Sequence, residues 1–308
     1  MIHPIPLKRP PFGTVMRRCW MLYLMAIPVM LYYIVFCYLP MFGIVIAFQD
    51  FRITRGFFGS KWVGLKNFEQ FFASEYAWTT IRNTLSISIY GLIFAFPAPI
   101  VLAILLNEVK NARFKKLVQT VTYMPHFISL VIICAMVMDF CSTRGLINTL
   151  ITGLGGKGIH FMTEPKWFYP IYILSGLWQH LGWDSIIYLA ALSAIDPELY
   201  EAATVDGAGR LRRILNVTLP GIAPTITILL ILRIGSIMSV GFEKIILLYT
   251  PAIYETADVI STFVYRKGLL DGKYSFAAAV GLMNSVINFA LLLGADRISK
   301  RLGQNGLF

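Results

Sequence analysis

Residues 199–221 read LYEAATVDGAGRLRRILNVTLPG. This is the longest polar, basic and glycine-punctuated stretch in a chain of 308 residues that is 57% hydrophobic. Apolar runs at about 168–191 and 221–241 flank it, and each is long enough for a membrane-spanning helix. We therefore expect the stretch to connect two membrane spans.

The connection begins with strong signals for a helix. Residues 196–198 are Asp-Pro-Glu, in which Asp suits the cap, Pro the first helical position and Glu the positive end of the helix dipole. This helix is predicted to run to about Val205 and to end at Asp206-Gly207, because glycine adopts left-handed conformations at little cost. Its small alanine side chains permit another surface to approach closely.

A second short helix is predicted from about Ala208 to Val217, and Leu219-Pro220 is expected to end it. Its arginines occupy polar positions, whereas its leucines and isoleucine form an apolar stripe. Taken by composition alone, the pair of helices resembles an interfacial segment whose arginines lie at anionic lipid headgroups. Contact with another protein is the alternative.

Apolar runs of 18 or more residues indicate membrane spans. They are continuous rather than alternating with a period of two, which favours helices over a barrel. The six runs lie at about 20–48, 84–106, 118–140, 168–191, 221–241 and 276–295. The sequence thus predicts an all-α polytopic membrane protein with six transmembrane helices in a single domain, 1–308, which contains a cytoplasmic loop at 196–220.

The net charge of +11 follows the positive-inside rule rather than indicating nucleic-acid binding. Basic residues gather before the first span, at 110–116, at 210–213 and after 296, and these segments share one side of the membrane if the N-terminus is cytoplasmic. We therefore expect a multi-pass protein of the bacterial inner membrane, in contact with lipid and with its N-terminus in the cytoplasm.

The order of residues in the connecting loop resembles the EAA loop of ABC importer permeases. In that family the loop forms a coupling helix that docks in a cleft of an ATPase subunit. The residues that carry the resemblance, and to which it assigns ATPase coupling, are Glu201, Ala202, Ala203, Asp206, Gly207, Ala208 and Arg210, followed by Leu219-Pro220.

The resemblance extends over nearly the whole chain. It includes the segments YLPMFGIVIAFQDF, GWDSIIYLAALSAIDPELYEAA and VGFEKIILLYTPAIYETADVISTFVYRKGL, which are similar to the branch serving complex saccharides and polysaccharide-derived oligomers. This implies a type I importer fold, an oligosaccharide substrate and several partners: a homologous second permease, two ATPase subunits and an extracytoplasmic solute-binding protein.

The sequence has no G-x-x-x-x-G-K-[ST] loop to cradle phosphates. We therefore expect no cofactor in this chain and no enzymatic activity of its own, with ATP and Mg²⁺ bound by the partner ATPase subunits. The alternative is a secondary transporter or channel for a polar solute, for which Asp139 and Asp184 are the candidate relay carboxylates. An intramembrane enzyme lacks a legible set of catalytic residues.

Polar residues inside the spans are the candidates for a substrate pathway, because burying them in lipid is costly. Arg233 is predicted to lie about midway along the fifth run, facing either a water-filled path or an acidic partner such as Asp139 or Asp184. The asparagines suit sugar hydroxyls or interhelical hydrogen bonds. The candidates are Arg233, Gln179, His180, Asp184, Asn284 and Asn288.

A pore-facing Arg233 favours an acidic oligosaccharide of the alginate kind, since arginine holds a carboxylate through two parallel hydrogen bonds. A neutral saccharide is the alternative if an aspartate cancels the charge. Basic residues of the outer loops either add attraction at the entrance or are simply solvated; they are Arg144, Lys157, Lys166, Lys244 and Lys273.

Overall fold

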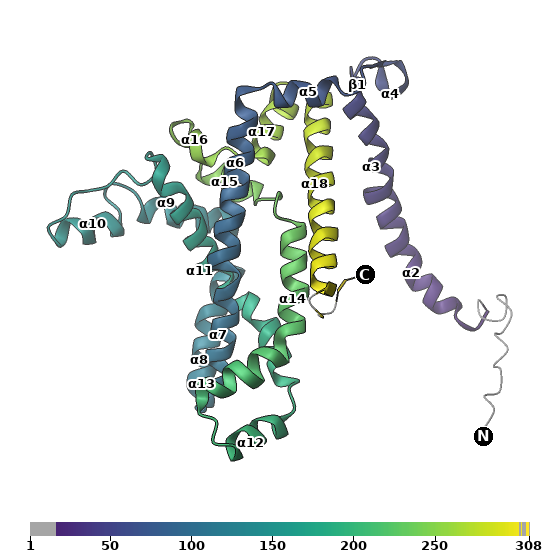
Figure 1. Ribbon diagram of the computed structural model, residues 1–308. Helices are drawn as coiled ribbons and strands as arrows, with labels where there is room; N and C mark the ends of the chain where they lie inside the picture. Colours follow the sequence, from purple (N-terminus) through teal and green to yellow (C-terminus); the bar gives the residue numbers. More distant parts are fainter. Residues whose placement is uncertain (1–16, 302, 304–305, 308) are drawn as a thin grey trace.

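Most of the apolar runs form long helices, and those labelled α6, α7, α14 and α18 point in similar directions in Figure 1. The computed structural model describes residues 17–301, 303 and 306–307. The N-terminal residues 1–16, which are predicted to be cytoplasmic, lie outside this part of the chain.

The first half contains α2 (Trp20–Tyr33), α3 (Leu39–Met41), α4 (Gly56–Gly59), α5 (Lys66–Phe72), α6 (Glu75–Tyr90), α7 (Pro97–Glu108), α8 (Ala112–Tyr123), α9 (Leu130–Phe140) and α10 (Leu146–Gly153). The second half contains α11 (Phe168–Ser193), α12 (Pro197–Val205), α13 (Arg210–Arg213), α14 (Leu219–Gly235), α15 (Phe242–Leu248), α16 (Tyr254–Ala257), α17 (Ile260–Tyr265) and α18 (Tyr274–Arg301). Two short antiparallel strands, β1 (Gln49–Asp50) and β2 (Lys61–Trp62), add a minor element to the expected all-α fold.

Tighter or wider helical turns join several of these helices. Those with 3₁₀ geometry are η2 (Phe42–Phe48), η4 (Met124–Phe127), η5 (Pro165–Trp167) and η7 (Pro251–Ile253). Those with π geometry are η1 (Ile34–Tyr38), η3 (Gly91–Ala95), η6 (Ile214–Thr218) and η8 (Arg266–Leu270).

Four helices of the described chain are long and apolar enough to cross a membrane. They are Trp20–Phe48, Glu75–Glu108, Arg210–Gly235 and Tyr274–Arg301. The 26-residue α11 also has the length, roughly 39 Å at 1.5 Å per residue, but Gln179, His180 and Asp184 make it less apolar. The predicted helical membrane fold is confirmed, whereas the predicted number of six spans is not reproduced as six straight helices.

The predicted span at 118–140 is not one continuous helix, because the chain bends by 100° between the helix Ala112–Phe127 and α9, as in a broken span or a re-entrant loop. Pro125 stands in the 3₁₀ turn η4, where it cannot donate a helical hydrogen bond. Ser129 then takes an extended backbone conformation and its hydroxyl accepts a hydrogen bond from the Ile132 N–H at 3.4 Å. A proline followed by a cap therefore starts a new helix in a new direction.

The prediction that Leu219-Pro220 ends a helix is wrong, because the helix continues from Arg210 to Gly235. The π-helical turn η6 directly precedes this proline, and η1 and η3 similarly precede Pro40 and Pro97. A π turn widens the helix and shifts its hydrogen bonds to more distant partners, which accommodates a residue without an N–H. The prolines thus mark distorted turns within long helices.

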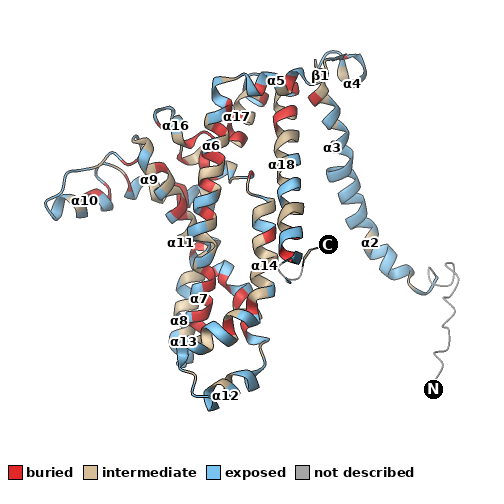
Figure 2. Ribbon diagram, in the orientation of Figure 1, coloured by how far each residue is buried: buried red, intermediate tan, exposed pale blue. Residues whose placement is uncertain are grey.

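The centre of the bundle is α11, which packs against α7, α8 and α14. Gly182 permits the approach of α8, because a β-carbon at this position would lie 2.3 Å from the Thr122 carbonyl oxygen. Aliphatic residues of α7, α11 and α14 form a core cluster near one end of the bundle, among them Ile104, Leu192 and Ile222. In Figure 2, buried residues (red) recur along α6, α7 and α18.

The outer surface carries many exposed apolar side chains. Helix α2 has no buried residues, and Leu22 and Met25 on it are 66% and 75% exposed. In Figures 1 and 2, α2 stands apart from the other long helices and is exposed along its length. Such a continuous apolar surface requires lipid or another protein as its environment.

Candidate functional site

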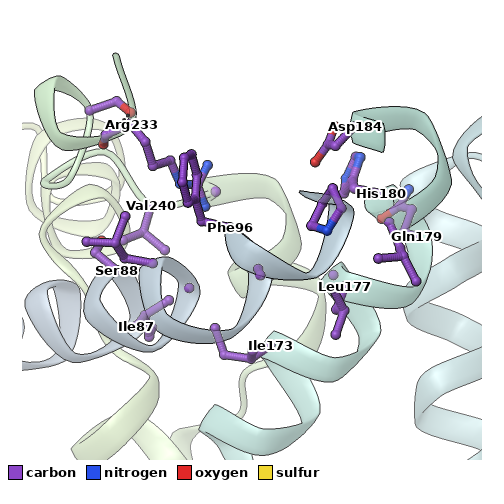
Figure 3. A pocket seen from close by; sticks show the side chains of 18 of the residues that line it. Ile87, Ser88, Phe96, Ile173, Leu177, Gln179, His180, Asp184, Arg233 and Val240 are labelled. Carbon is purple, nitrogen blue, oxygen red and sulfur yellow. Dashed lines mark hydrogen bonds between the residues drawn. The ribbon is translucent and has the colours of Figure 1, made fainter. Parts of the chain in front are cut away.

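A cavity of about 820 Å³ lies between α6, η3, α7, α11 and α14 and reaches α15. Its size falls within the range of roughly 300–1,000 Å³ that is typical of ligand sites. Four of the predicted pathway residues line it: Gln179, His180, Asp184 and Arg233. Figure 3 shows Arg233 beside Phe96, with Asp184, His180 and Gln179 across the cavity. Mixed polar and apolar walls of this kind suit a saccharide.

Arg233 lies in the last turn of α14 rather than midway along a span, because this helix ends at Gly235 instead of near residue 241. Its guanidinium lies near η3, since a β-carbon at Gly91 would be 3.5 Å from its Nη2. No ion pair of the described residues includes Arg233. Asp184 shares the cavity with it, whereas Asp139 is not among the cavity residues.

The backbone beyond α14 is unwound at residues 236–241 and borders the cavity. Asn288 on α18 accepts a hydrogen bond from the Met238 N–H at 2.9 Å and donates one to the Ser239 hydroxyl at 2.9 Å. The Ser88 hydroxyl on α6 donates to the Ile237 carbonyl. Irregular backbone at membrane depth is tolerated where protein groups or a cavity satisfy it.

The two predicted asparagine candidates therefore lie outside the cavity wall. Asn288 holds the unwound backbone, which is the interhelical use of the side chain. Asn284 lies one turn earlier on the same helix, and its amide oxygen is buried without a hydrogen-bond partner. Neither contributes to the lining of the cavity.

The break at η4 meets α11 through a group of rings. The His126 and Trp183 rings stack with centroids 4.2 Å apart and planes 1° from parallel. The Nδ1 atoms of His126 and His180 lie 3.3 Å apart, so one ring donates a hydrogen bond to the other. This contact places the Trp183 indole at the cavity wall and joins the bent segment to the centre of the bundle.

Sequence reasoning missed Lys244, which was expected at an outer loop. Its side chain is only 7% exposed and lines the cavity. Its Nζ donates a hydrogen bond to the Tyr172 carbonyl at 2.9 Å and lies 4.7 Å from the centroid of the Tyr172 ring. The available signal was its place within an apolar segment, GFEKIILL.

The other four basic residues that were entrance candidates are exposed: Arg144, Lys157, Lys166 and Lys273. Lys166 forms an ion pair with Glu164 at 2.7 Å. Their hydrogen bond holds the pKa of the Glu164 carboxyl below its usual value. Exposed pairs of this kind contribute little to stability.

The connecting loop has the predicted local structure. Asp196 caps α12 by accepting a hydrogen bond from the Glu198 N–H at 3.0 Å, and α12 ends at Val205. Gly207 has a φ of +75°, the left-handed conformation expected of it. Helix α12 has no buried residues and projects at one end of the molecule (Figure 1).

The loop is tied to the bundle by polar contacts. The hydroxyls of Tyr200 and Thr218 lie 3.2 Å apart, and Arg213 donates to the Thr204 hydroxyl at 3.1 Å. Arg210 forms an ion pair with Glu108 at the end of α7, at 3.8 Å. These contacts join the loop to η6 and to α7, and α7 borders the cavity.

The remaining coupling candidates are accessible for contact. Glu201, Ala202 and Asp206 are exposed, and Ala203 and Ala208 are partly exposed. A surface of small side chains beside a few charges is compatible with docking of another protein.

Residues 95–304, more than half of the chain, match the model of the binding-protein-dependent transport system inner membrane component family. The chain belongs to this family. The matched region contains the cavity residues of α11 and α14 and the whole connecting loop, so the predicted resemblance to importer permeases is confirmed.

Similar proteins cover nearly the full permease. Protein LplB of Bacillus subtilis is 45% identical over 294 residues, which is 95% of this chain and 92% of LplB. The polygalacturonan/rhamnogalacturonan transport system permease protein YteP of the same organism is 46% identical over 288 residues, 93% of this chain and 90% of YteP.

A solved structure has the same architecture. It is the crystal structure of a bacterial alginate ABC transporter in complex with an alginate pentasaccharide-bound periplasmic protein. Its matching chain is 43% identical with a TM-score of 0.89, and the match covers 97% of this chain and 100% of that one. The protein is therefore a permease subunit of an ABC importer in the inner membrane, which decides against the secondary transporter and the intramembrane enzyme.

Proposed function

We propose that this permease subunit carries acidic oligosaccharides, of the uronic-acid kind, through the cavity that Arg233 lines. The observation that carries the proposal is a guanidinium on the cavity wall for which the described residues provide no ion-pair partner. The similar proteins support it, because one serves polygalacturonan and rhamnogalacturonan and another serves alginate.

The physical argument rests on the cost of a charge away from water. An arginine in a membrane protein is retained where it meets water, an anion or a partner. A passing carboxylate accepts two parallel hydrogen bonds from the guanidinium and loses its own hydration at the same place. Attraction is also stronger there than in bulk water, because charges in a narrow site are weakly screened.

The same proposal includes the partner subunits of the transporter. A homologous second permease completes the pathway, and an extracytoplasmic binding protein delivers the saccharide. Two ATPase subunits bind ATP and Mg²⁺ and dock on α12, which places α12 and the N-terminus in the cytoplasm. Support comes from the exposed, capped helix α12, from its contact with η6 through Tyr200 and Thr218, and from the ion pair of Arg210 on α13 with Glu108 on α7.

A neutral saccharide is the second candidate, favoured by the presence of Asp184 in the same cavity. In that case the two opposite charges would balance each other across the cavity, and a carboxylate on the substrate would gain nothing.

The deciding experiment compares acidic and neutral substrates in the assembled transporter. Uptake into proteoliposomes is measured for an alginate tetrasaccharide and for its carboxyl-reduced, neutral form, with Arg233 and with Arg233→Gln. We expect the ratio of acidic to neutral uptake to fall about tenfold, as for loss of a charge-assisted hydrogen bond. Arg233→Lys, which keeps the charge, is the matched control, and an unchanged ratio in Arg233→Gln rejects the acidic substrate.

A further inference from the structure

The cavity wall contains a second basic side chain, whose burial the sequence did not reveal. Lys244 is 7% exposed, and no ion pair of the described chain includes it. Its neighbour Glu243 is exposed and also lines the cavity. A buried ammonium without a carboxylate is costly, so its retention requires a reason.

The contacts of Lys244 within the chain explain its position but not its charge. Its ammonium has three donors, and one of them reaches the Tyr172 carbonyl at 2.9 Å. The face of the Tyr172 ring, 4.7 Å away, offsets part of the desolvation of the cation. A neutral donor would satisfy the same carbonyl without the cost of a buried charge.

The walls also leave room for this ammonium. A β-carbon at Gly176 on α11 would lie 3.0 Å from the Lys244 Nζ, so a larger residue there would displace it. Gly91 also borders Arg233, but a β-carbon there would be 3.5 Å from Nη2, an ordinary contact. Lys244 and Arg233 thus present two positive charges to one cavity of about 820 Å³.

We infer that Lys244 is a specificity-determining residue that binds a second carboxylate of the substrate while Arg233 binds the first. The inference rests on the proposed function and extends it: the preferred substrate carries carboxylates on more than one sugar unit. Two cations on one cavity wall stabilise two carboxylates at once, whereas a saccharide with one acidic unit engages only one of them.

The test uses the number of carboxylates as its variable. The whole transporter, with its partner subunits and one binding protein, is reconstituted in proteoliposomes. Uptake is measured for three alginate trisaccharides: fully acidic, partially reduced with a single carboxylate, and fully reduced. The same binding protein serves every permease variant, so its own selectivity cancels when the ratios of the variants are compared.

We expect Lys244→Met to lower the ratio of fully acidic to singly acidic uptake about tenfold, the loss of one charge-assisted hydrogen bond. Lys244→Arg restores the ratio because it retains the positive charge. A purely structural role would reduce uptake of all three saccharides in proportion, and an unchanged ratio in Lys244→Met overturns the inference.

The outcomes separate this inference from the proposed function. If Arg233→Gln removes the preference for acidic over neutral saccharides but Lys244→Met leaves the ratio of fully acidic to singly acidic uptake unchanged, only the role of Lys244 is rejected. If the unmodified transporter takes up the fully reduced saccharide as well as the acidic ones, both are rejected. Equal membrane levels of the variants, measured by immunoblot, are the condition for the comparison.

Discussion

At the scale of the residue, Gly207 has a conformation that follows from its chemistry. Its φ of +75° lies in the region that glycine adopts without a steric penalty, and nothing lies within 4 Å of the position a β-carbon would take. The cost of another residue there is therefore backbone strain and not collision. A substitution at Gly207 therefore tests the conformation of the turn without disturbing the packing around it.

Replacing Gly207 by Val is expected to strain the turn by about 1–3 kcal/mol. The strain would tilt α12 relative to α13, so transport and substrate-stimulated ATP hydrolysis of the assembled importer should fall together. Both are measured in proteoliposomes, with membrane insertion followed by immunoblot. Gly209→Ala is a control, because Gly209 has an open environment and a φ of −66°. Normal coupling in Gly207→Val would contradict a role for this turn.

The two basic residues of the cavity differ in how far the sequence predicts their positions. Arg233 was recognisable because a charge in a long apolar run is unusual in a membrane protein. Lys244 was not, because the run before it was assumed to end in an exposed loop. The unwound residues 236–241 instead lead into α15, whose Lys244 is buried at the cavity. Only tertiary structure makes that distinction.

At the scale of the element, the unwound segment after α14 depends on side chains from its neighbours. Asn288 on α18 both accepts from the Met238 N–H and donates to the Ser239 hydroxyl. Asn284 is one turn earlier, and its amide oxygen has no partner. The two asparagines therefore have the same chemistry but different numbers of contacts.

Asn288→Ala should destabilise the permease by about 1–3 kcal/mol, because it leaves a backbone donor without a partner. Asn284→Ala should change stability less, since it removes a buried oxygen that is already unsatisfied. Thermal unfolding of the detergent-solubilised transporter measures both. Equal losses from the two substitutions would argue that Asn288 is not what holds the segment.

Prolines account for most of the difference between expected and observed elements. Pro197 at the start of α12 followed the simple rule for a first helical position, and the predicted helix to Val205 is confirmed. Pro220 did not end a helix, because the π turn η6 before it accommodates a residue that has no N–H to donate. Pro125 did redirect the chain, with the cap at Ser129 fixing the new start. The local sequence identifies each proline, but the surrounding packing decides whether the helix ends, bends or continues there.

At the scale of the whole molecule, several surfaces of the chain have no contacts within the described residues. Its exterior is apolar, α2 stands apart from the bundle, and α12 is exposed at one end (Figures 1 and 2). The cavity has the volume of a ligand site, about 820 Å³, and the sequence contains no G-x-x-x-x-G-K-[ST] loop. Under the proposed function, energy from an ATPase subunit reaches the cavity through α12.

If partner subunits supply the energy, the purified single chain should have no activity towards ATP. Because the sequence lacks the glycine-rich loop and lysine that hold nucleotide phosphates, the isolated permease should neither bind nor hydrolyse ATP. Addition of the ATPase subunits should produce hydrolysis, and the saccharide-loaded binding protein should stimulate it. Binding of a fluorescent ATP analogue and release of phosphate are the measurements. An ATPase subunit with its phosphate-loop lysine replaced is the control that identifies the source of turnover. Specific ATP turnover by the permease alone would overturn the assignment of coupling to α12, because the chain would then supply the energy itself.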